Sequence, residues 1–230
     1  MASGLERYFD DAGELAAYEE FVRAQEMAPE PFDLERPALV CRWRMAGKRV
    51  PMLNRHIRSL SQRSVQGSPL SHNLLSWAKQ HIEWSLAEGG FTERDGVLML
   101  VVDVNGNAAM SVGAYEPLAC TDAAALAARA ADARVEAAQT GVAPEVLCRV
   151  ADGVLTLGAE GHLCGTATLV EQLAATRGLA AVRGEVTVDD ATGLFLVSDE
   201  HGIVPAEGSA PDAFVELARA GYEKLRAAAR

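Results

Sequence analysis

Hydrophobic residues recur every three or four positions in residues 5–27 and 71–88, which is the spacing of a helix that buries one face. The second segment is the clearer of the two, because Ser71 can cap its start and a Gly-Gly pair at 89–90 ends it. Its apolar stripe, which predicts the buried face, consists of Leu70, Leu74, Trp77, His81 and Trp84.

Capping residues and glycines predict the remaining helices. An alanine-rich stretch has Thr121 or Asp122 as its N-cap and Gly141 as its end. A loop from Gly161 leads into a helix that ends at Gly178. A short helix is expected at residues 54–62 and a last one at residues 212–229.

Short apolar runs separated by turn residues predict strands, mostly in antiparallel pairs. ALVCRWRM and KRVPML flank the turn at Ala46 and Gly47, and GVLMLVVDV and NAAMSVGAY flank the strong hairpin signal Asn105-Gly106. Further strands are expected in PEVLCRVADGVLTLG, GEVTVDD and GLFLVSDEHGIVPAE.

Helices and hairpins alternate irregularly, without repeated βαβ units, and this order predicts an α+β fold with largely antiparallel sheets. We expect an N-terminal helical extension over residues 1–36, an α/β subdomain over residues 37–120 and a second α/β subdomain over residues 121–230.

Composition limits the function more than it defines it. The chain is 49% hydrophobic, so it can bury a core, and its net charge of −11 argues against a nucleic-acid partner. We expect no membrane association, because no window approaches 18 apolar residues and the N-terminus lacks the apolar region of a signal peptide. The four cysteines show no metal-binding or CxxC spacing, so we interpret them as core or half-buried thiols in a reducing cytoplasm.

The loop Gly161 to Thr168 is the first candidate site. Small residues and hydroxyls at a helix start could bind a phosphate through backbone N–H groups and the hydroxyls of Thr166 and Thr168. The same residues could equally serve only as a cap, which is the commoner use. Because no acidic or bulky side chain interrupts GTAT, we expect its amides to be open to an anion.

Other groups of reactive side chains point less clearly to chemistry. Five residues could offer oxygen or nitrogen ligands to a cation, but they lie at predicted turns and match no metal-binding loop, so we expect no metal site. These residues are Asp189, Asp190, Asp199, Glu200 and His201. His81 is expected to be buried and hydrogen-bonded, and Trp77 and Trp84 to be core. No GxSxG motif supports a hydrolase.

The order of these pieces resembles the class IV aminotransferases, the fold-type-IV pyridoxal-phosphate enzymes that include branched-chain and D-amino-acid aminotransferases and aminodeoxychorismate lyase. VCRWRMAGKRVPMLNRHIRSL is similar to the family's early hairpin and His-x-x-Arg-Leu helix. DGVLTLGAEGHLCGTATLVEQLAATRGLAAVRGEVTVDD resembles the stretch that contains the family's L-x-G-I-T-R motif. GLFLVSDEHGIVPAEG and PDAFVELARAGYEKLRA resemble the closing strand and the last helix.

The resemblance implies a homodimer and a cofactor-phosphate site at the start of the helix that follows Gly161. Gly165, Thr166 and Ala167 match the family's glycine and the two residues after it, and Ser198 stands where the family offers another hydroxyl. Thr168 adds a neighbouring hydroxyl, and Arg58 is the nearest arginine of the early helix. The expected cofactor-binding residues are therefore Gly165, Thr166, Ala167, Thr168, Ser198 and Arg58.

Departures from the family concern the reaction itself. Pyridoxal phosphate forms a Schiff base with a lysine, but residues 119–150, where the family keeps it, contain none. The stretch between the two halves is also shorter than in the family. The family's arginine falls at Ser59, one position from Arg58, and Glu145 is the one guess for the acidic partner of the pyridine nitrogen.

We therefore expect a class-IV-like protein with a degenerate cofactor site that binds a small anionic ligand or a partner without transamination. One alternative is an active pyridoxal-phosphate-dependent aminotransferase or lyase, and another is a structural or interaction protein. The catalytic residues, the substrate and the oligomeric state do not follow from the sequence.

Overall fold

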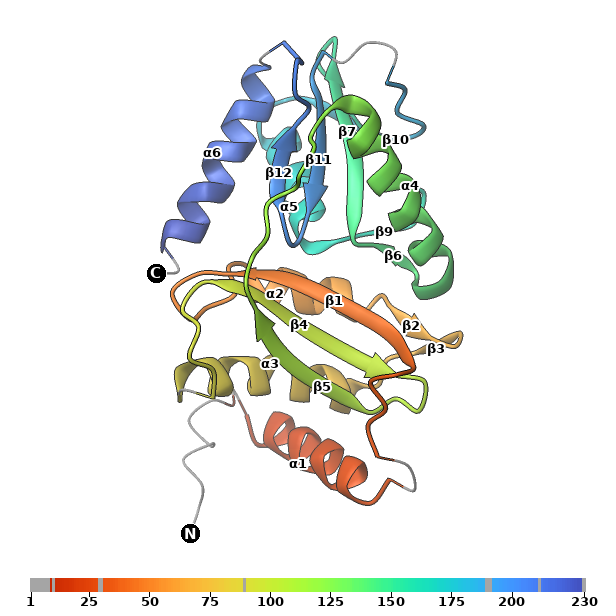
Figure 1. The fold of residues 1–230 in the computed structure, drawn as a ribbon, viewed down its shortest axis with the longest axis vertical. Helices are drawn as coiled ribbons and strands as arrows, with labels where there is room; N and C mark the ends of the chain where they lie inside the picture. Colours follow the sequence, from red (N-terminus) through yellow and green to blue (C-terminus); the bar gives the residue numbers. More distant parts are fainter. Residues whose placement is uncertain are drawn as a thin grey trace.

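Two β-sheets lie one above the other in the computed structural model (Figure 1), which describes residues 9, 11–28, 31–88, 90–188, 192–210 and 212–228. The first sheet has the order β1-β4-β5 and the second the order β10-β8-β7-β11-β12. All pairs in the two sheets are antiparallel except β10 with β8, so the α+β prediction is confirmed. Where subdomains begin and end remains a prediction.

The first sheet is covered by α3, and α1 packs on α3 from outside (Figure 1). In β1, every second residue from Leu39 to Met45 is buried, and these side chains meet the indole of Trp77 in one apolar core. The elements of this half are α1 Ala12–Glu26, β1 Pro37–Met45, α2 Leu53–Leu60, β2 Ser64–Val65, β3 Ser68–Pro69, α3 His72–Ala87, β4 Gly96–Asp103 and β5 Ala108–Gly113.

The second sheet is covered on both faces. Phe195 and Val197 of β11 belong to the core under α5 and α6, whereas Leu194 and Leu196 pack under α4. This double cover explains why every residue of β11 is buried. The elements are α4 Ala123–Thr140, β6 Val142–Ala143, β7 Glu145–Ala151, β8 Val154–Leu157, β9 His162–Leu163, α5 Gly165–Thr176, β10 Ala180–Arg183, β11 Leu194–Ser198, β12 Gly202–Pro205 and α6 Ala213–Ala228.

Local signals correctly placed most elements. Asp122 caps α4 through the Ala125 amide, and Gly141 ends it with a φ of 91°. Ser71 caps α3, the Asn105-Gly106 hairpin joins β4 to β5, and the predicted turns at Asp152 and His201 are present. The helix expected from residue 5 begins at Ala12 with Asp11 as its cap, while residues 1–8 lie outside the described residues.

Two strand predictions are wrong. KRVPML is not a strand, because β1 pairs with the distant β4, and only a single bridge from Ala46 to Arg49 closes the turn. GEVTVDD is irregular from Gly184 to Val188, and its last residues, Asp189 and Asp190, lie outside the described residues. The strand comes earlier, as β10, and stops at Arg183 because its partner β8 ends at Leu157.

Predicted core residues fall into two groups. Leu74 and Trp77 are buried, whereas Leu70, His81 and Trp84 are half-buried. His81 stacks on Trp77 with ring centroids 4.9 Å apart, but its buried Nδ1 has no hydrogen-bond partner in the described part of the chain, contrary to expectation.

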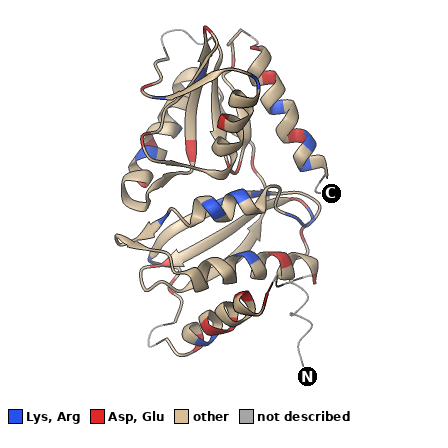
Figure 2. Cartoon of the chain, turned by 180° about the vertical axis from the view of Figure 1, so that it is seen from behind, with Lys and Arg blue, Asp and Glu red and all other residues tan. Residues whose placement is uncertain are grey.

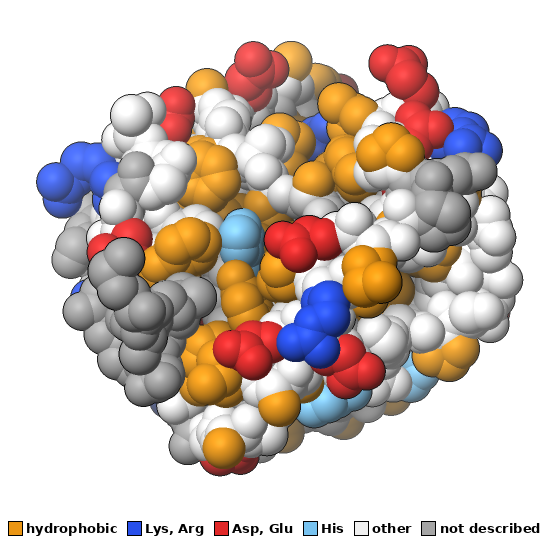
Figure 3. Space-filling model, turned by 90° about the horizontal axis from the view of Figure 1, so that it is seen from below, with side chains coloured by type: hydrophobic (Ala, Val, Ile, Leu, Met, Phe, Trp, Pro, Cys, Tyr) orange, Lys and Arg blue, Asp and Glu red, His pale blue; other side chains and the backbone are white. Residues whose placement is uncertain are grey.

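Figure 3 shows the end of the molecule below α1 and α3, where hydrophobic side chains reach the surface among charged ones. Among the cysteines, Cys120 is exposed, which corrects our interpretation, and the other three are buried.

Every helix in the described ranges is too short or too polar to cross a bilayer. Within the same ranges, His, Cys, Asp and Glu side chains form no group of three or more that could hold a metal ion.

Candidate functional site

The start of α5 already holds a carboxylate from elsewhere in the chain. Asp199, in the turn between β11 and β12, accepts a hydrogen bond from the Thr166 amide at 2.7 Å and one from the Gly165 amide at 3.3 Å. Asp199 is only 5% exposed to solvent. The helix dipole and the two amides at the helix start thus interact with an internal anion.

His56 of α2 completes this buried contact. Its Nδ1 lies 3.2 Å from Asp199 Oδ2. Burial by itself raises the pKa of Asp199, but the nearby His56, together with the Thr166 amide, outweighs burial and lowers the pKa to about 2. The Arg44 amide of β1 also donates to the backbone oxygen of Asp199 at 3.0 Å, so the turn connects α2, α5 and the first sheet.

Gly165 is required here for a steric reason. A Cβ at this position would lie 2.5 Å from His56 Nδ1, closer than real Cβ contacts allow. The glycine therefore makes room for the imidazole that faces Asp199. Our expectation of open amides is wrong for Gly165 and Thr166, since a residue more than thirty positions away uses them. The Thr168 hydroxyl donates back to the Gly165 carbonyl.

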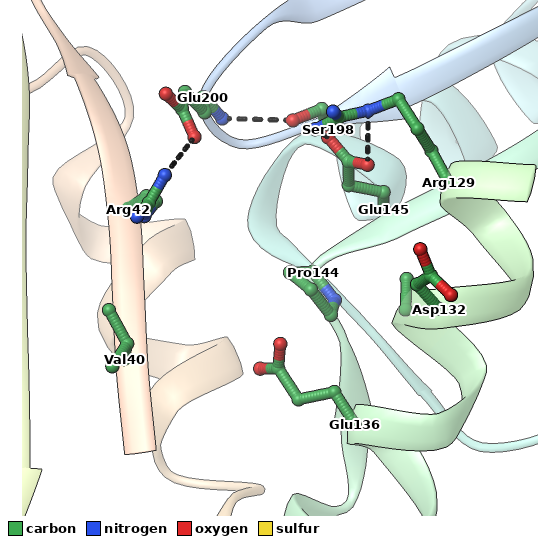
Figure 4. A pocket seen from close by; sticks show the side chains of 10 residues that line it. Val40, Arg42, Arg129, Asp132, Glu136, Pro144, Glu145, Ser198 and Glu200 are labelled. Carbon is green, nitrogen blue, oxygen red and sulfur yellow. Dashed lines mark hydrogen bonds and ion pairs between the residues drawn. The ribbon is translucent and has the colours of Figure 1, made fainter. Parts of the chain in front are cut away.

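A cavity of about 390 Å³ lies between the two sheets, with β1 on one side and α4 and β7 on the other (Figure 4). Its charged side chains are the arginines Arg42 and Arg129 and the carboxylates Asp132, Glu136, Glu145 and Glu200. Arg129 donates to Glu145 from Nε at 2.9 Å and from Nη2 at 2.8 Å, and Arg42 lies 3.6 Å from Glu200. With four carboxylates against two guanidiniums, this lining disfavours an anionic ligand.

The β11–β12 turn forms one wall of the cavity between the sheets. The Ser198 hydroxyl accepts from the amides of Glu200 and His201, each at 3.1 Å. Burial lowers the pKa of His201, and the carboxylates of Glu200 and Glu145 offset only part of that effect. His201 lies 3.3 Å from Arg129 and 3.4 Å from the Tyr115 hydroxyl, so this wall is held by a polar network.

A second cavity, of about 360 Å³, lies between α2, α5 and the loop that enters β9. We call it the α2–α5 hollow. Its charged residues are Arg55, Arg58, Arg183 and Glu171, with His162 at the rim. Its charge is therefore opposite in sign to the net charge of the chain. In Figure 2, where Lys and Arg positions are coloured blue on the ribbon, basic residues lie along α2.

The six residues predicted from the sequence do not meet at one site. Gly165, Thr166 and Ala167 are buried in the first turn of α5, and Ser198 lines the cavity between the sheets. Thr168 and Arg58 both line the α2–α5 hollow. Whether any of them binds a cofactor remains a prediction.

All three lysines lie in the described part of the chain and away from the cavity between the sheets. Lys48 donates to the Phe91 carbonyl at 3.0 Å. Lys79 Nζ lies 3.8 Å from Glu14 Oε1, on the α1 side of α3. Lys224 is exposed on α6.

Two central residues, Asp199 and His56, were misjudged from the sequence. The sequence pattern places Asp199 at a predicted turn and gives His56 a role only in the His-x-x-Arg-Leu pattern. The turn assignment was correct, but only the packing of β11 and β12 against α5 brings the carboxylate to the helix start. An acidic residue directly after a mostly apolar strand is the signal that the sequence offers.

Comparison with known proteins identifies the fold. No family model and no curated protein matches the sequence. Among solved structures, the chain is similar to a hypothetical aminotransferase from Mycobacterium tuberculosis in its apo form, with 14% identity, a TM-score of 0.56 and coverage of 88% of this chain and 94% of that one. The same Mycobacterium tuberculosis protein has also been solved in a PLP-bound form.

Two further structures agree. A Thermotoga maritima protein named as a candidate branched-chain amino acid aminotransferase is 14% identical, with a TM-score of 0.55 and coverage of 87% of this chain and 92% of that one. A Legionella pneumophila protein named as a candidate 4-amino-4-deoxychorismate lyase is 10% identical, with a TM-score of 0.52 and coverage of 87% and 97%. The likeness extends over most of the chain at low identity, so this protein has the fold of the class IV aminotransferases.

Proposed function

We propose that this protein is a class-IV-aminotransferase-like protein that does not hold pyridoxal phosphate covalently and that acts by binding a small anionic ligand. One observation carries the cofactor part of the proposal: the Asp199 carboxylate occupies the Gly165 and Thr166 amides, where the resemblance would place the cofactor phosphate. The basic lining of the α2–α5 hollow supports an anionic ligand.

Electrostatics explains why the Asp199 carboxylate and a cofactor phosphate exclude each other at this helix start. A phosphate needs the same N–H donors that Asp199 uses, and two anions about 4 Å apart repel by about 4 kcal/mol per pair of unit charges at an effective dielectric constant of 20. Asp199 also has the buried His56 as its partner, so moving it away would leave that imidazole without its anion. The residues present at this helix start therefore do not fit the phosphate of the cofactor.

The positions of the lysines support the same proposal. A Schiff base requires an amine inside the cavity that holds the cofactor. The amines of Lys48 and Lys79 are engaged with groups of the first half, and Lys224 lies on the outer surface of α6.

Absorbance and borohydride trapping test the proposal. We expect purified protein, with and without added pyridoxal phosphate, to show no band at about 400–430 nm and no borohydride-dependent mass gain on a lysine peptide. Lys48→Arg, Lys79→Arg and Lys224→Arg serve as controls that identify any labelled amine. A yellow protein whose band disappears on reduction, with label on one lysine that its arginine variant removes, would establish the active-enzyme alternative instead.

A further inference from the structure

The α2–α5 hollow is a partly open cavity whose lining carries uncompensated positive charge. Among the described residues, the Arg58 side chain makes no hydrogen bond or ion pair, although it stands at the wall of the hollow. Arg55 contacts only neutral groups, the Thr168 hydroxyl at 3.3 Å and the Gln172 side chain. Two of the three guanidiniums therefore have no carboxylate partner among the described residues.

The third guanidinium closes the hollow on its far side. Arg183 binds Glu171 at 2.8 Å and the Gly161 carbonyl at 3.3 Å, which holds it at the edge of the hollow. With this one ion pair counted, the lining of the hollow keeps a net charge of about +2, whereas the whole chain carries a net charge of −11. Three guanidiniums around one hollow that holds a single acid offer the donors that suit a phosphate or carboxylate, so the lining points to an anion.

Ser59 supplies an independent observation. It also lines the hollow, it is only 6% exposed, and its hydroxyl has no hydrogen-bond partner among the described residues. A buried hydroxyl without a partner is unfavourable unless a bound group satisfies it. An oxygen of a bound anion would accept its proton.

We propose that the α2–α5 hollow is a binding site for a phosphate group, either inorganic phosphate or a small phosphate monoester, held by Arg58, Arg55 and the Ser59 hydroxyl with Arg183 at the edge. This inference rests on the proposed function and specifies which cavity takes the anion. The α5 amides have no part in the site, because Asp199 occupies them. Guanidinium groups suit a phosphate because their planar fork donates two parallel hydrogen bonds to its oxygens. The volume also leaves room for a small organic group on a monoester.

Calorimetric titration of the full chain at low ionic strength tests the site, with inorganic phosphate and glycerol 3-phosphate as separate ligands and chloride as the ionic-strength control. We expect wild type to bind phosphate with a millimolar or lower Kd. Tighter binding of the ester than of inorganic phosphate would identify a monoester as the source, and equal or weaker binding would identify the free ion. Arg58→Gln should weaken phosphate binding about tenfold or more. It should leave the melting temperature unchanged, since the Arg58 side chain loses no hydrogen bond or ion pair to any residue that the structure describes.

Two variants separate the site from general surface charge. Arg177→Gln removes an exposed arginine after α5 that does not line the hollow, so the Kd should stay within about twofold of the wild-type value. Arg58→Lys keeps the charge without the fork, so its Kd should lie between those of wild type and Arg58→Gln. Equal binding by wild type and Arg58→Gln, or no phosphate-specific heat in wild type at about 20 mM, would overturn the inference.

Amide NMR of the wild-type protein locates the anion without any substitution. Phosphate should shift the signals of Ser59 and of residues 161–163 and leave those of Gly165 and Thr166 in place. Shifts confined to Gly165 and Thr166 would mean that the anion displaces Asp199, and the inference would be wrong. None of these titrations bears on the colour and borohydride tests, so a failure of this inference can be told apart from a failure of the proposed function.

Discussion

Replacing Asp199 by alanine should destabilise the protein more than the loss of an ordinary helix cap. The substitution removes the acceptor of the Gly165 and Thr166 amides and the anion beside His56, all in a buried position. Breaking a buried ion pair by removing one partner costs about 3–5 kcal/mol. For a chain of this length, each kcal/mol lowers the melting temperature by about 2–4 °C, so we expect a decrease of roughly 6–20 °C.

Asp212→Ala is the matched control. Asp212 also accepts from two amides at a helix start, those of Phe214 and Val215 at 2.8 and 3.0 Å, but it is only partly buried and has no histidine beside it. Its removal should cost about 1 kcal/mol, as for other caps. Thermal melting followed by circular dichroism compares the two variants. Equal decreases in melting temperature would refute the buried-pair reasoning.

Chemical rescue extends this test. Asp199→Ala leaves a small hole lined by two amides and an imidazole, and a formate ion has the size of the lost carboxylate. With a Kd of about 10 mM, 100 mM formate would restore about 1.4 kcal/mol. We expect formate, compared with chloride, to raise the melting temperature of Asp199→Ala by several degrees and to leave wild type unchanged. A variant that responds no more than wild type would show that the hole collapses or that no anion is needed there.

Two other outcomes follow from burial and charge. Trp77→Ala should lower the free energy of unfolding by about 3–5 kcal/mol, because Trp77 is only 4% exposed and contacts Phe21 and His81. Trp84 is half-buried, so Trp84→Ala should lower it clearly less. Equal urea midpoints for Trp77→Ala and wild type would place the apolar stripe of α3 in solvent. The folded-state pKa of Asp199, about 2, lies below its ordinary 3.8, so its contribution of about 2 kcal/mol is complete above pH 4 and is lost as the pH falls toward 2. The stability difference between wild type and Asp199→Asn should shrink over that range, and a constant difference would contradict the assignment.

Local chemistry decided the elements that the sequence predicted correctly. Asp122 and Gly141 bound α4 because capping and left-handed backbone depend on residues only a few positions apart. The Asn105-Gly106 hairpin depends on two adjacent residues. The apolar run ALVCRWRM likewise predicted the strand β1. It did not predict that β4 rather than KRVPML pairs with β1, since strand pairing depends on residues far apart in the sequence.

Tertiary structure alone decided the candidate sites. The carboxylate of Asp199 reaches the start of α5 across 33 positions, and the α2–α5 hollow brings Arg58 to the same wall as Arg183, 125 positions later. Periodicity and caps report which residues are buried and where helices end, but not which distant side chain meets a helix dipole. That depends on how β11 and β12 pack against α5, so the sequence predicted a helix start suited to an anion, and only the fold showed that the anion is the protein's own aspartate.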